Sequence, residues 1–334
     1  MRTILLTNNP SSFQLVYNQR SMERMKAVAE LDPQRYTSEY VLSHPSDFSD
    51  VENIFSTWGM PSFTVAQIKE IFPALKRLFY AAGSVQSFAR PFLACGVEVY
   101  SAWGANGTSV AEYTVAQIVL ACKGFFTLSS LVKQKARGEA DRIKRSFPGV
   151  YGERVGLIGC GMIGSIVAEM LGQYSMEILV FDPFLSDERA ERLGVRKAAL
   201  EEIFSTCGVV SNHLANKKET VGLLRYEHFS AMRPYSSFIN TGRGAQVVEG
   251  DLVRVLTERP DITAVLDVTW PEPAEYSHPF YDLPNCVLTP HIAGSVHPSD
   301  QVRMVEYMIE EYQNCVNGRP CRFQITEKML ETLA

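Results

Sequence analysis

Three polar side chains with complementary chemistry follow short apolar runs in the second half of the chain. They are Arg243 in INTGRG, Glu272 in LDVTWPEP and His291 in TPHIAG. A planar guanidinium can pair with a carboxylate or polarise a keto oxygen, and an imidazole can give or take a proton near neutral pH. A carboxylate would orient that imidazole and favour its protonated form. We therefore predict a catalytic set suited to reducing a 2-oxo acid; the alternatives are a helix-capping or salt-bridging Arg, a buried structural His and a surface Glu.

A glycine-rich segment, GLIGCGMIG at 156–164, lies between an expected strand and an expected helix. Gly159 would permit a tight turn, Gly161 would leave room for a pyrophosphate, and Gly164 would let the helix pack close to the strand. The helix N-terminus would present free N–H groups to the phosphates. The spacing alone is a weak signal, but in the strand-turn-helix context it predicts a dinucleotide site.

Asp182 lies 18 residues after Gly164, at the end of the apolar run ILVFD. A carboxylate at this place can bind both ribose hydroxyls of an adenosine and would repel a 2′-phosphate. No Arg or Lys follows until Arg189. We therefore expect NAD rather than NADP; the alternative is that Asp182 is a solvated turn residue before Pro183.

The elements that position these residues are predicted from apolar periodicity. The expected strands cover residues 3–7, 52–57, 77–81, 154–158, 177–181, 209–212, 237–240, 264–268 and 287–289. The expected helices cover residues 13–31, 61–72, 110–132, 165–171 and 299–316. Strands alternating with helices predict an α/β fold with doubly wound parallel sheets, in which ligands bind at the carboxyl ends of the strands.

A chain of 334 residues exceeds the usual size of a single hydrophobic core, so two domains are expected. The sequence loosens at SAWGANGT (101–108), where we place the first junction. We predict a Rossmann NAD-binding domain at 104–293, inserted into a substrate domain made of 1–103 and 294–334. This arrangement would place the cofactor in a cleft between the domains.

Several motifs together resemble the D-isomer-specific 2-hydroxyacid dehydrogenases, the family of phosphoglycerate dehydrogenase, glyoxylate/hydroxypyruvate reductase and D-lactate dehydrogenase. The resemblance runs from about Leu78 to Arg319. Its motifs are VAEYT (110–114), NTGRG (240–244), the block from Asp267 to Pro273, PHIAG (290–294) and the closing NGRP (317–320). The resemblance implies a flavodoxin-like substrate domain and a homodimer formed through the 110–132 helix.

The resemblance also implies further binding residues. The main-chain N–H groups of Gly83 and Ser84 would bind the substrate carboxylate. The implied cofactor-contacting residues are Met162, Ile163, Thr241, Asp267, His291 and Gly294. Trp58, in STWGMP, is a candidate wall of the substrate pocket, with ordinary packing as the alternative, whereas His297 is expected at the surface.

Three places depart from the family pattern. Ala215, in HLANKKET after His213, stands where a proline is usual. The loop after Gly83 reads SVQSFARP instead of the common GVDNID type, and the stretch before Gly152 lacks the usual tryptophan. These departures leave the chemistry intact, but the sequence does not identify the 2-oxo acid.

We predict an enzyme that reversibly transfers a hydride between nicotinamide and C2 of a small 2-oxo or D-2-hydroxy acid. One alternative is an NAD-sensing binding protein with little turnover, like the corepressor branch of the same family. Formate or phosphonate oxidation would use the same Arg and His, but Glu272 counts against formate. Because the chain ends at Ala334, we expect no appended regulatory domain.

Composition excludes several other classes of protein. The net charge of −5 and the pI of about 5.8 oppose nucleic-acid binding. The seven scattered cysteines, none spaced as C-x-x-C, oppose a disulfide framework and a zinc site, so no metal is expected. No signal peptide or membrane span is evident, so a cytoplasmic location is the default.

Overall fold

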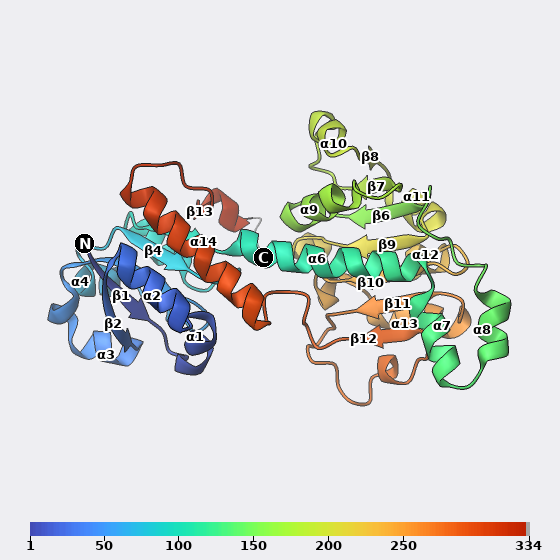
Figure 1. Ribbon diagram of the computed structural model, residues 1–334, viewed down its shortest axis with the longest axis horizontal. Helices are drawn as coiled ribbons and strands as arrows, with labels where there is room; N and C mark the ends of the chain where they lie inside the picture. Colours follow the sequence, from blue (N-terminus) through green and yellow to red (C-terminus); the bar gives the residue numbers. More distant parts are fainter. Residues whose placement is uncertain (332–334) are drawn as a thin grey trace. The chain divides into compact units, whose positions relative to one another are not determined.

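The computed structural model describes residues 1–331 and divides into two compact units. The discontinuous unit comprises residues 1–107 and 294–334, and the central unit comprises residues 108–293. Each unit is an α/β layer structure, with helices on both faces of its own sheet (Figure 1). Residues 332–334, the end of the predicted 294–334 segment, lie outside the described residues.

The sheet of the discontinuous unit has the strand order β13-β5-β4-β3-β1-β2. Its strands are β1 (Arg2–Leu6), β2 (Glu30–Tyr36), β3 (Val51–Ser56), β4 (Arg77–Tyr80), β5 (Glu98–Ser101) and β13 (Gln324–Ile325). The first five pair in parallel in the flavodoxin-like order 2-1-3-4-5. This order confirms the predicted fold class, to which the structure adds an antiparallel edge strand, β13.

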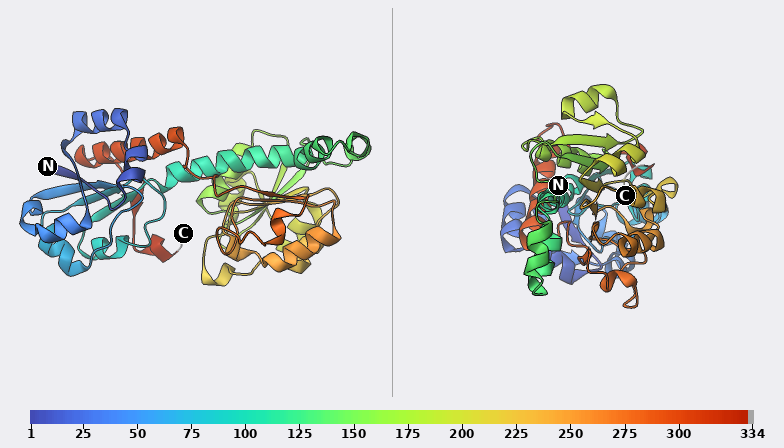
Figure 2. Two further views of the ribbon diagram at one scale, coloured as in Figure 1. Left: turned by 90° about the horizontal axis from the view of Figure 1, so that it is seen from below. Right: turned by 90° about the vertical axis from the view of Figure 1, so that its right-hand side faces the viewer.

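Helices cover both faces of this sheet (Figures 1 and 2). One face carries α1 (Pro10–Val16), α2 (Gln19–Val28) and α14 (Pro298–Val316), and the other carries α3 (Ser38–Ser43), α4 (Val65–Ile71) and α5 (Ala89–Ala94). Aromatic rings join α14 to the sheet: Phe79 stacks on Tyr100 at 5.0 Å and meets Tyr312 edge-on at 5.6 Å between ring centroids. The return of the chain after residue 293 therefore completes the core of the first unit.

The central sheet is entirely parallel and has the order β12-β11-β10-β9-β6-β7-β8. Its strands are β6 (Arg154–Ile158), β7 (Glu177–Phe181), β8 (Arg196–Lys197), β9 (Val209–Asn212), β10 (Ser237–Asn240), β11 (Thr263–Leu266) and β12 (Cys286–Leu288). This is the doubly wound Rossmann order, with the first and fourth strands adjacent. The inner strands β6, β9, β10 and β11 are buried on both faces almost throughout, which explains why they appear in the sequence as short apolar runs. The short edge strand β8 is charged and exposed, and the apolar pattern did not predict it.

Two apolar cores lie on either side of the central sheet. The helices of this unit are α7 (Phe125–Lys133), α8 (Arg137–Ile143), α9 (Met162–Leu171), α10 (Asp187–Leu193), α11 (Leu200–Thr206), α12 (Tyr226–Ser230) and α13 (Glu249–Glu258), with most of α6 (Trp103–Cys122). The short 3-10 helices of the chain are η1 (Pro45–Phe48), η2 (Lys218–Thr220), η3 (Gly244–Gln246), η4 (Pro279–Tyr281) and η5 (Lys328–Glu331). Helix α6 runs along one face of the sheet (Figure 2), where Ile118 belongs to the same core as Leu157 and Ile239.

The single helix predicted over residues 13–31 is wrong. The chain forms α1 and α2 instead, because the Asn18 side chain caps α2 by accepting the Ser21 N–H at 3.0 Å. The segment from Glu30 to Tyr36 then forms β2 rather than helix. This strand is polar and contains Pro33, which an edge strand can accommodate. Its sequence has no apolar pattern that predicts a strand, and its conformation depends on pairing with β1.

The helix predicted over residues 110–132 is also wrong in its bounds. Helix α6 already begins at Trp103, within the segment expected to be loose, because Gly104 and Ala105 are buried and packing outweighs their local preference. The helix stops before Gly124, whose φ of +67° is left-handed, and α7 continues at a bend of 66°. Elsewhere α4 begins only at Val65, after its Thr64 cap.

Among residues 1–331, no single helix is long and apolar enough to cross a membrane, although α6 and α7 would meet that test if their bend were ignored.

His213, directly after β9, is a buried titratable group in the central unit. Its Nε2 lies 3.0 Å from Ser211 Oγ, and its Nδ1 has no hydrogen-bond partner in the part of the chain described. Burial lowers the pKa of His213 from 6.5 to about 4. The ring is therefore neutral at pH 7 in the folded protein.

This burial predicts a loss of stability in acid. Because the pKa of His213 is lower in the folded protein, the unfolded chain takes up the proton first as the pH falls through about 6.5 toward 4. Between pH 7.5 and 5 this group should remove about 2 kcal/mol from the free energy of unfolding. This change in the free energy of unfolding is measured by urea unfolding at both pH values. The proteins compared are wild type, His213→Gln and the exposed control His297→Gln. If His213→Gln lost as much free energy of unfolding in acid as wild type does, His213 would not be the group responsible.

Candidate active site

Parallel pairing brings the carboxyl ends of six strands in the central sheet to one level. The aligned strand-end residues are Phe181, Ile158, Asn212, Asn240, Leu266 and Leu288. The residues that follow them are Asp182, Gly159, His213, Thr241, Asp267 and Thr289. The strand order reverses between β6 and β9, which is where ligands bind in such sheets. The loops that carry the predicted site residues of the central unit therefore all start at the same edge of the sheet.

The glycine turn after β6 has the geometry of a phosphate cradle. Gly159 has a φ of +94°, and a Cβ atom there would lie 2.7 Å from the His213 carbonyl oxygen. A Cβ atom on Gly164 would lie 2.1 Å from the Gly159 carbonyl oxygen, so α9 can pack this closely only with glycine. A Cβ atom on Gly161 would meet nothing within 4 Å, which leaves open space at the N-terminus of α9. A pyrophosphate fits this turn, because the first N–H groups of a helix attract anions.

Asp182 follows β7 and faces the glycine turn. Its Oδ2 accepts the Cys160 N–H at 2.7 Å, and its Oδ1 accepts the Phe184 N–H at 2.8 Å. Each carboxylate oxygen has a further lone pair available for a hydroxyl donor. Arg189, the first cation after this strand, donates to Ser165 Oγ at 2.6 Å. The geometry suits a carboxylate that binds ribose hydroxyls beside the pyrophosphate turn.

The structure brings Glu272 and His291 together. Glu272 lies in the loop after β11 and His291 in the loop after β12, with 2.6 Å between Glu272 Oε1 and His291 Nδ1. The two side chains are 35% and 48% exposed, so the pair is open to a ligand. Since a carboxylate on Nδ1 fixes the proton there, Nε2 is the nitrogen left to exchange a proton with a substrate.

Asp267 anchors the loop that carries His291. Its Oδ1 accepts the Thr289 hydroxyl at 2.6 Å and the Ile292 N–H at 2.9 Å, and its Oδ2 accepts the Ala293 N–H at 2.9 Å. The His291 N–H donates to the main-chain oxygens of Asp267 and Thr289 at 3.1 and 3.0 Å. The Asp267 side chain is thus committed to the protein and only 2% of the residue is exposed. Its contact with a cofactor stays a prediction.

Arg243 lies in the loop after β10, directly before η3. Its Nη1 donates to the Gly242 carbonyl oxygen at 2.8 Å, and its main-chain N–H donates to Gln246 Oε1 at 3.2 Å. The Arg243 backbone lies at the N-cap of η3, and helix capping was the alternative to a catalytic role for this residue. The guanidinium is half-buried and retains donors beyond the one that binds Gly242.

A buried network of amide side chains, which the sequence analysis missed, fixes the Arg243 loop. Asn212 Nδ2 donates to Asn240 Oδ1 at 3.0 Å and to Gln246 Oε1 at 2.6 Å. Gln246 Nε2 donates to the carbonyl oxygens of Leu214 and Ala215 at 2.8 and 3.0 Å. The sequence signal was an asparagine closing each of two neighbouring apolar strands.

Glu249 is a second residue that the sequence analysis missed. It accepts the Trp270 N–H at 2.8 Å and lies 3.4 Å from His278 Nε2, so it holds both ends of the loop that carries Glu272. Burial raises the pKa of Glu249 to about 6. No local pattern marks this residue, because its partners lie some twenty or more positions away.

The remaining predicted residues belong to the discontinuous unit. Gly83 and Ser84 follow β4, where Ser101 Oγ donates to the Gly83 carbonyl oxygen at 2.6 Å, and Trp58 follows the neighbouring strand β3. Trp58 is half-buried against the core of this unit. Gly294 lies beside Asn106, whose Oδ1 accepts the Ser295 N–H at 2.9 Å. His297 is exposed, as predicted.

The unusual loop SVQSFARP is tied to the far end of the chain. Gln86 Nε2 donates to the Leu330 carbonyl oxygen at 2.7 Å, and Arg90 Nη1 donates to Gln86 Oε1 at 3.0 Å. Leu330 is itself buried in η5. The departure from the family pattern after Gly83 therefore coincides with a contact made by the C-terminal segment.

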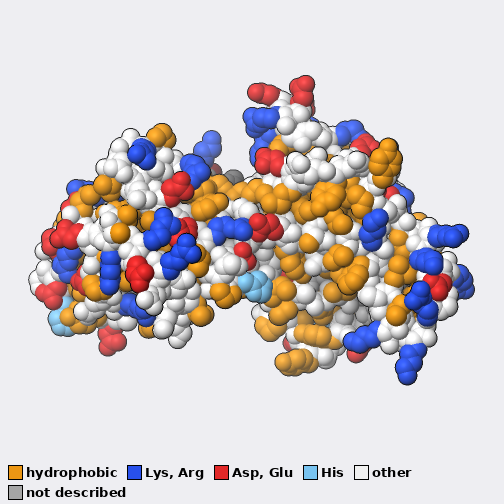
Figure 3. Space-filling model, viewed as in Figure 1, with side chains coloured by type: hydrophobic (Ala, Val, Ile, Leu, Met, Phe, Trp, Pro, Cys, Tyr) orange, Lys and Arg blue, Asp and Glu red, His pale blue; other side chains and the backbone are white. Residues whose placement is uncertain are grey.

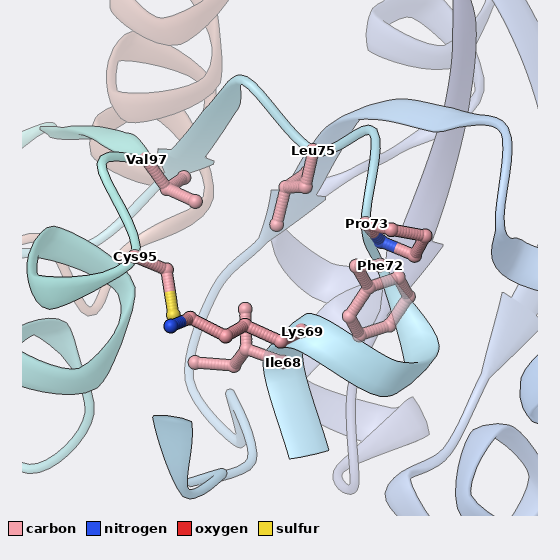
Figure 4. A pocket seen from close by; sticks show the side chains of 7 residues that line it. All are labelled: Ile68, Lys69, Phe72, Pro73, Leu75, Cys95 and Val97. Carbon is pink, nitrogen blue, oxygen red and sulfur yellow. The ribbon is translucent and has the colours of Figure 1, made fainter. Parts of the chain in front are cut away.

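A shallow hollow in the discontinuous unit lies away from these residues. It holds about 170 Å³ and is lined by Ile68, Lys69, Phe72, Pro73, Leu75, Cys95 and Val97 (Figure 4). Leu75 and Val97 precede β4 and β5, so the hollow lies at the amino ends of the strands. Ligand sites of open α/β sheets lie at the other edge, and the hollow is smaller than most. No group of three or more potential metal ligands occurs within residues 1–331.

Comparison with known proteins shows what the chain is similar to. A family model described as "D-isomer specific 2-hydroxyacid dehydrogenase, NAD binding domain" matches residues 115–293. D-3-phosphoglycerate dehydrogenase of Archaeoglobus fulgidus is 31% identical over 236 residues, which are 71% of this chain and 44% of that protein. D-3-phosphoglycerate dehydrogenase of Bacillus subtilis is 31% identical over 225 residues, 67% of this chain and 42% of that protein. The chain thus spans less than half the length of these two relatives.

Solved structures share the fold across nearly the whole chain. A phosphoglycerate oxidoreductase from Rhizobium etli has a TM-score of 0.82 at 20% identity, covering 98% of this chain and 99% of that one. The apo D-mandelate dehydrogenase of Rhodotorula graminis has a TM-score of 0.77 at 18% identity, covering 98% of each chain. Since the family model matches more than half of the residues, this chain belongs to the D-isomer-specific 2-hydroxyacid dehydrogenase family.

Proposed function

We propose that the protein is an NAD-dependent oxidoreductase that transfers a hydride between nicotinamide and C2 of a small 2-oxo or D-2-hydroxy acid. The observation that carries this proposal is the 2.6 Å contact between His291 Nδ1 and Glu272 Oε1. It lies on the same sheet edge as the glycine turn that fits a pyrophosphate. An acid-base pair and a dinucleotide cradle on one edge are the parts that this reaction needs.

Most of the residues proposed to hold the cofactor belong to the central unit, and one, Gly294, belongs to the discontinuous unit. The glycine turn, with the N–H groups of Met162 and Ile163, would bind the pyrophosphate, and Asp182 the adenosine ribose. Thr241, Asp267 and Gly294 are proposed as further contacts by the family resemblance. When bound, NAD supplies the nicotinamide C4 that gives or accepts the hydride.

The side chains of this protein would then bind the substrate and move the proton. Arg243 would pair with the carboxylate or the keto oxygen, because its guanidinium offers fixed paired donors. The family resemblance implies that the main-chain N–H groups of Gly83 and Ser84 bind the substrate carboxylate and makes Trp58 a candidate wall of the substrate pocket. His291 Nε2 would protonate the forming alkoxide in reduction and take the proton back in oxidation, while Glu272 holds Nδ1.

A screen of 2-oxo acids tests the proposal. Glyoxylate, hydroxypyruvate, pyruvate, and branched and aromatic 2-oxo acids are each mixed with NADH, and absorbance of the reduced cofactor is followed. We expect the protein to reduce at least one of these acids, and to do so faster with NADH than with NADPH, since Asp182 would repel a 2′-phosphate. Tight NADH binding with no turnover on any of them would contradict the proposal and favour an NAD-sensing binding protein.

Replacing the proposed acid separates chemistry from binding. His291→Asn should lower kcat by about a hundredfold or more, because general acid catalysis typically contributes that much. The affinity for NADH, measured by quenching of tryptophan fluorescence, should stay close to wild type. His297→Asn is the matched control, since His297 is exposed at the start of α14. Equal turnover in both variants would remove His291 from the reaction.

We also propose that the protein is a homodimer. The supporting feature is an apolar face on α6 and α7, formed by Val119, Leu120, Phe125, Leu128 and Val132, all at least partly exposed. Apolar side chains gather along this part of the central unit in Figure 3. Phe125 and Val132 are 49% and 47% exposed, and a patch of this kind marks a contact surface. A second copy is the simplest occupant, since most soluble oligomers are symmetric dimers.

Sedimentation of wild type and of Phe125→Asp tests the dimer. Wild type should sediment at twice the chain mass and Phe125→Asp largely at the chain mass, because a buried charge opposes association. Leu15→Asp is the control, since Leu15 is also exposed, at 62%, but lies on α1. A wild-type monomer at micromolar concentration would refute the proposal.

The proposed location is the cytoplasm, which the free thiols of all seven cysteines support.

A further inference from the structure

The motif VAEYT on α6 has no part in the reaction proposed above, yet two of its side chains reach the edge of the central sheet. Thr114 Oγ1 lies 3.1 Å from Thr241 Oγ1, in the loop that leads to Arg243. The Tyr113 hydroxyl lies 3.0 Å from Thr289 Oγ1, in the loop that carries His291. Neighbouring residues of one helix turn thus contact two of the loops that hold the proposed catalytic side chains.

The direction of the hydrogen bonds from Tyr113 follows from the number of protons available. A threonine hydroxyl has one hydrogen to donate. Thr289 donates it to Asp267 Oδ1 at 2.6 Å. The Tyr113 hydroxyl must therefore donate to Thr289. The result is a directed chain of hydrogen bonds from Tyr113 through Thr289 to the carboxylate of Asp267.

The chain ends on a loop that needs support. His291 has a φ of +53°, a left-handed conformation that is unfavourable for a residue with a Cβ atom. Such a conformation persists only where the surroundings fix it. Here Asp267 fixes it from both sides, by accepting the Thr289 hydroxyl before His291 and the N–H groups of Ile292 and Ala293 after it.

The environment of Tyr113 suits a permanent donor. Tyr113 is half-buried, and burial raises the pKa of its hydroxyl above the ordinary value of 10. The hydroxyl therefore keeps its proton throughout the range in which a dehydrogenase would work. Tyr113 lies on α6, so the donor is attached to a rigid helix rather than to a loop.

We propose that Tyr113 is a positioning residue for His291, acting through the hydroxyl of Thr289 and the carboxylate of Asp267. The proposal rests on the proposed function, because it gives His291 the role of proton donor. Losing the Tyr113 hydroxyl would leave Thr289 free to turn away from Asp267. The His291 ring would then spend less time in the orientation that Glu272 fixes, while the cofactor turn would be unchanged.

The test compares four single variants and one double variant with wild type. Tyr113→Phe and Thr289→Val each interrupt the chain of hydrogen bonds, Thr289→Ser keeps it, and Tyr151→Phe is the control because Tyr151 is 90% exposed. The first readout is amide hydrogen exchange of residues 291–293, and the second is kcat and KM with NADH and the best 2-oxo acid. Amide exchange needs no turnover, so it reports on the loop even without a known substrate.

We expect faster exchange of the Ile292 and Ala293 amides in Tyr113→Phe and Thr289→Val. In the same two variants kcat should fall about three- to tenfold, the size of one lost hydrogen bond, with both KM values within about twofold of wild type. Thr289→Ser and Tyr151→Phe should match wild type. The double variant Tyr113→Phe/Thr289→Val should be no slower than Thr289→Val alone, since both act through one chain of contacts.

The outcomes separate this proposal from the proposed function. Wild-type turnover with unchanged exchange and unchanged kcat in Tyr113→Phe overturns the role of Tyr113 and leaves the proposed function standing. A rise in KM for NADH without a fall in kcat also overturns it, because it would place Tyr113 in cofactor binding. Absence of wild-type turnover on every 2-oxo acid refutes the proposed function. It then also refutes the proposal that Tyr113 positions His291 for catalysis.

Discussion

In-register parallel pairing of the central strands is the constraint on which the candidate site depends. Asn240 of β10 pairs with Leu266 of β11, which pairs with Leu288 of β12, so three loops start at one level. Residues far apart in sequence, Arg243, Glu272 and His291, leave the sheet from these neighbouring strands. A shift of one strand by a single residue would turn its side chains to the opposite face and move its loop away from the others.

That constraint explains what could be predicted from sequence. Buried parallel strands are short apolar runs, and the runs ending at Ile158, Phe181, Asn212 and Asn240 end where the structure ends β6, β7, β9 and β10. A polar side chain just after such a run lies on the ligand-binding edge, so Glu272 and His291 could be placed near each other. Their contact is observed, whereas their roles stay proposals.

Features that depend on distant contacts escaped prediction. Strand β2 is polar and forms only because β1 offers it a partner, and the bend before α7 depends on the left-handed Gly124. The supports of the site were missed for the same reason. Gln246 is fixed by Asn212, 34 residues away, and Glu249 holds Trp270, 21 residues away. A pattern within a window of ten or so residues contains no trace of such pairs.

The proposed reaction passes a hydride between the nicotinamide of NAD and C2 of a D-2-hydroxy acid. NADH carrying deuterium at C4 can be supplied with the 2-oxo acid, other than glyoxylate, that the protein reduces best. Glyoxylate is left out because its product has no D and L isomers. The product is then examined by proton NMR and chiral chromatography. We expect deuterium from one face of the nicotinamide at C2 of the product, which should be the D isomer. Product without deuterium, or with the L configuration, would contradict it.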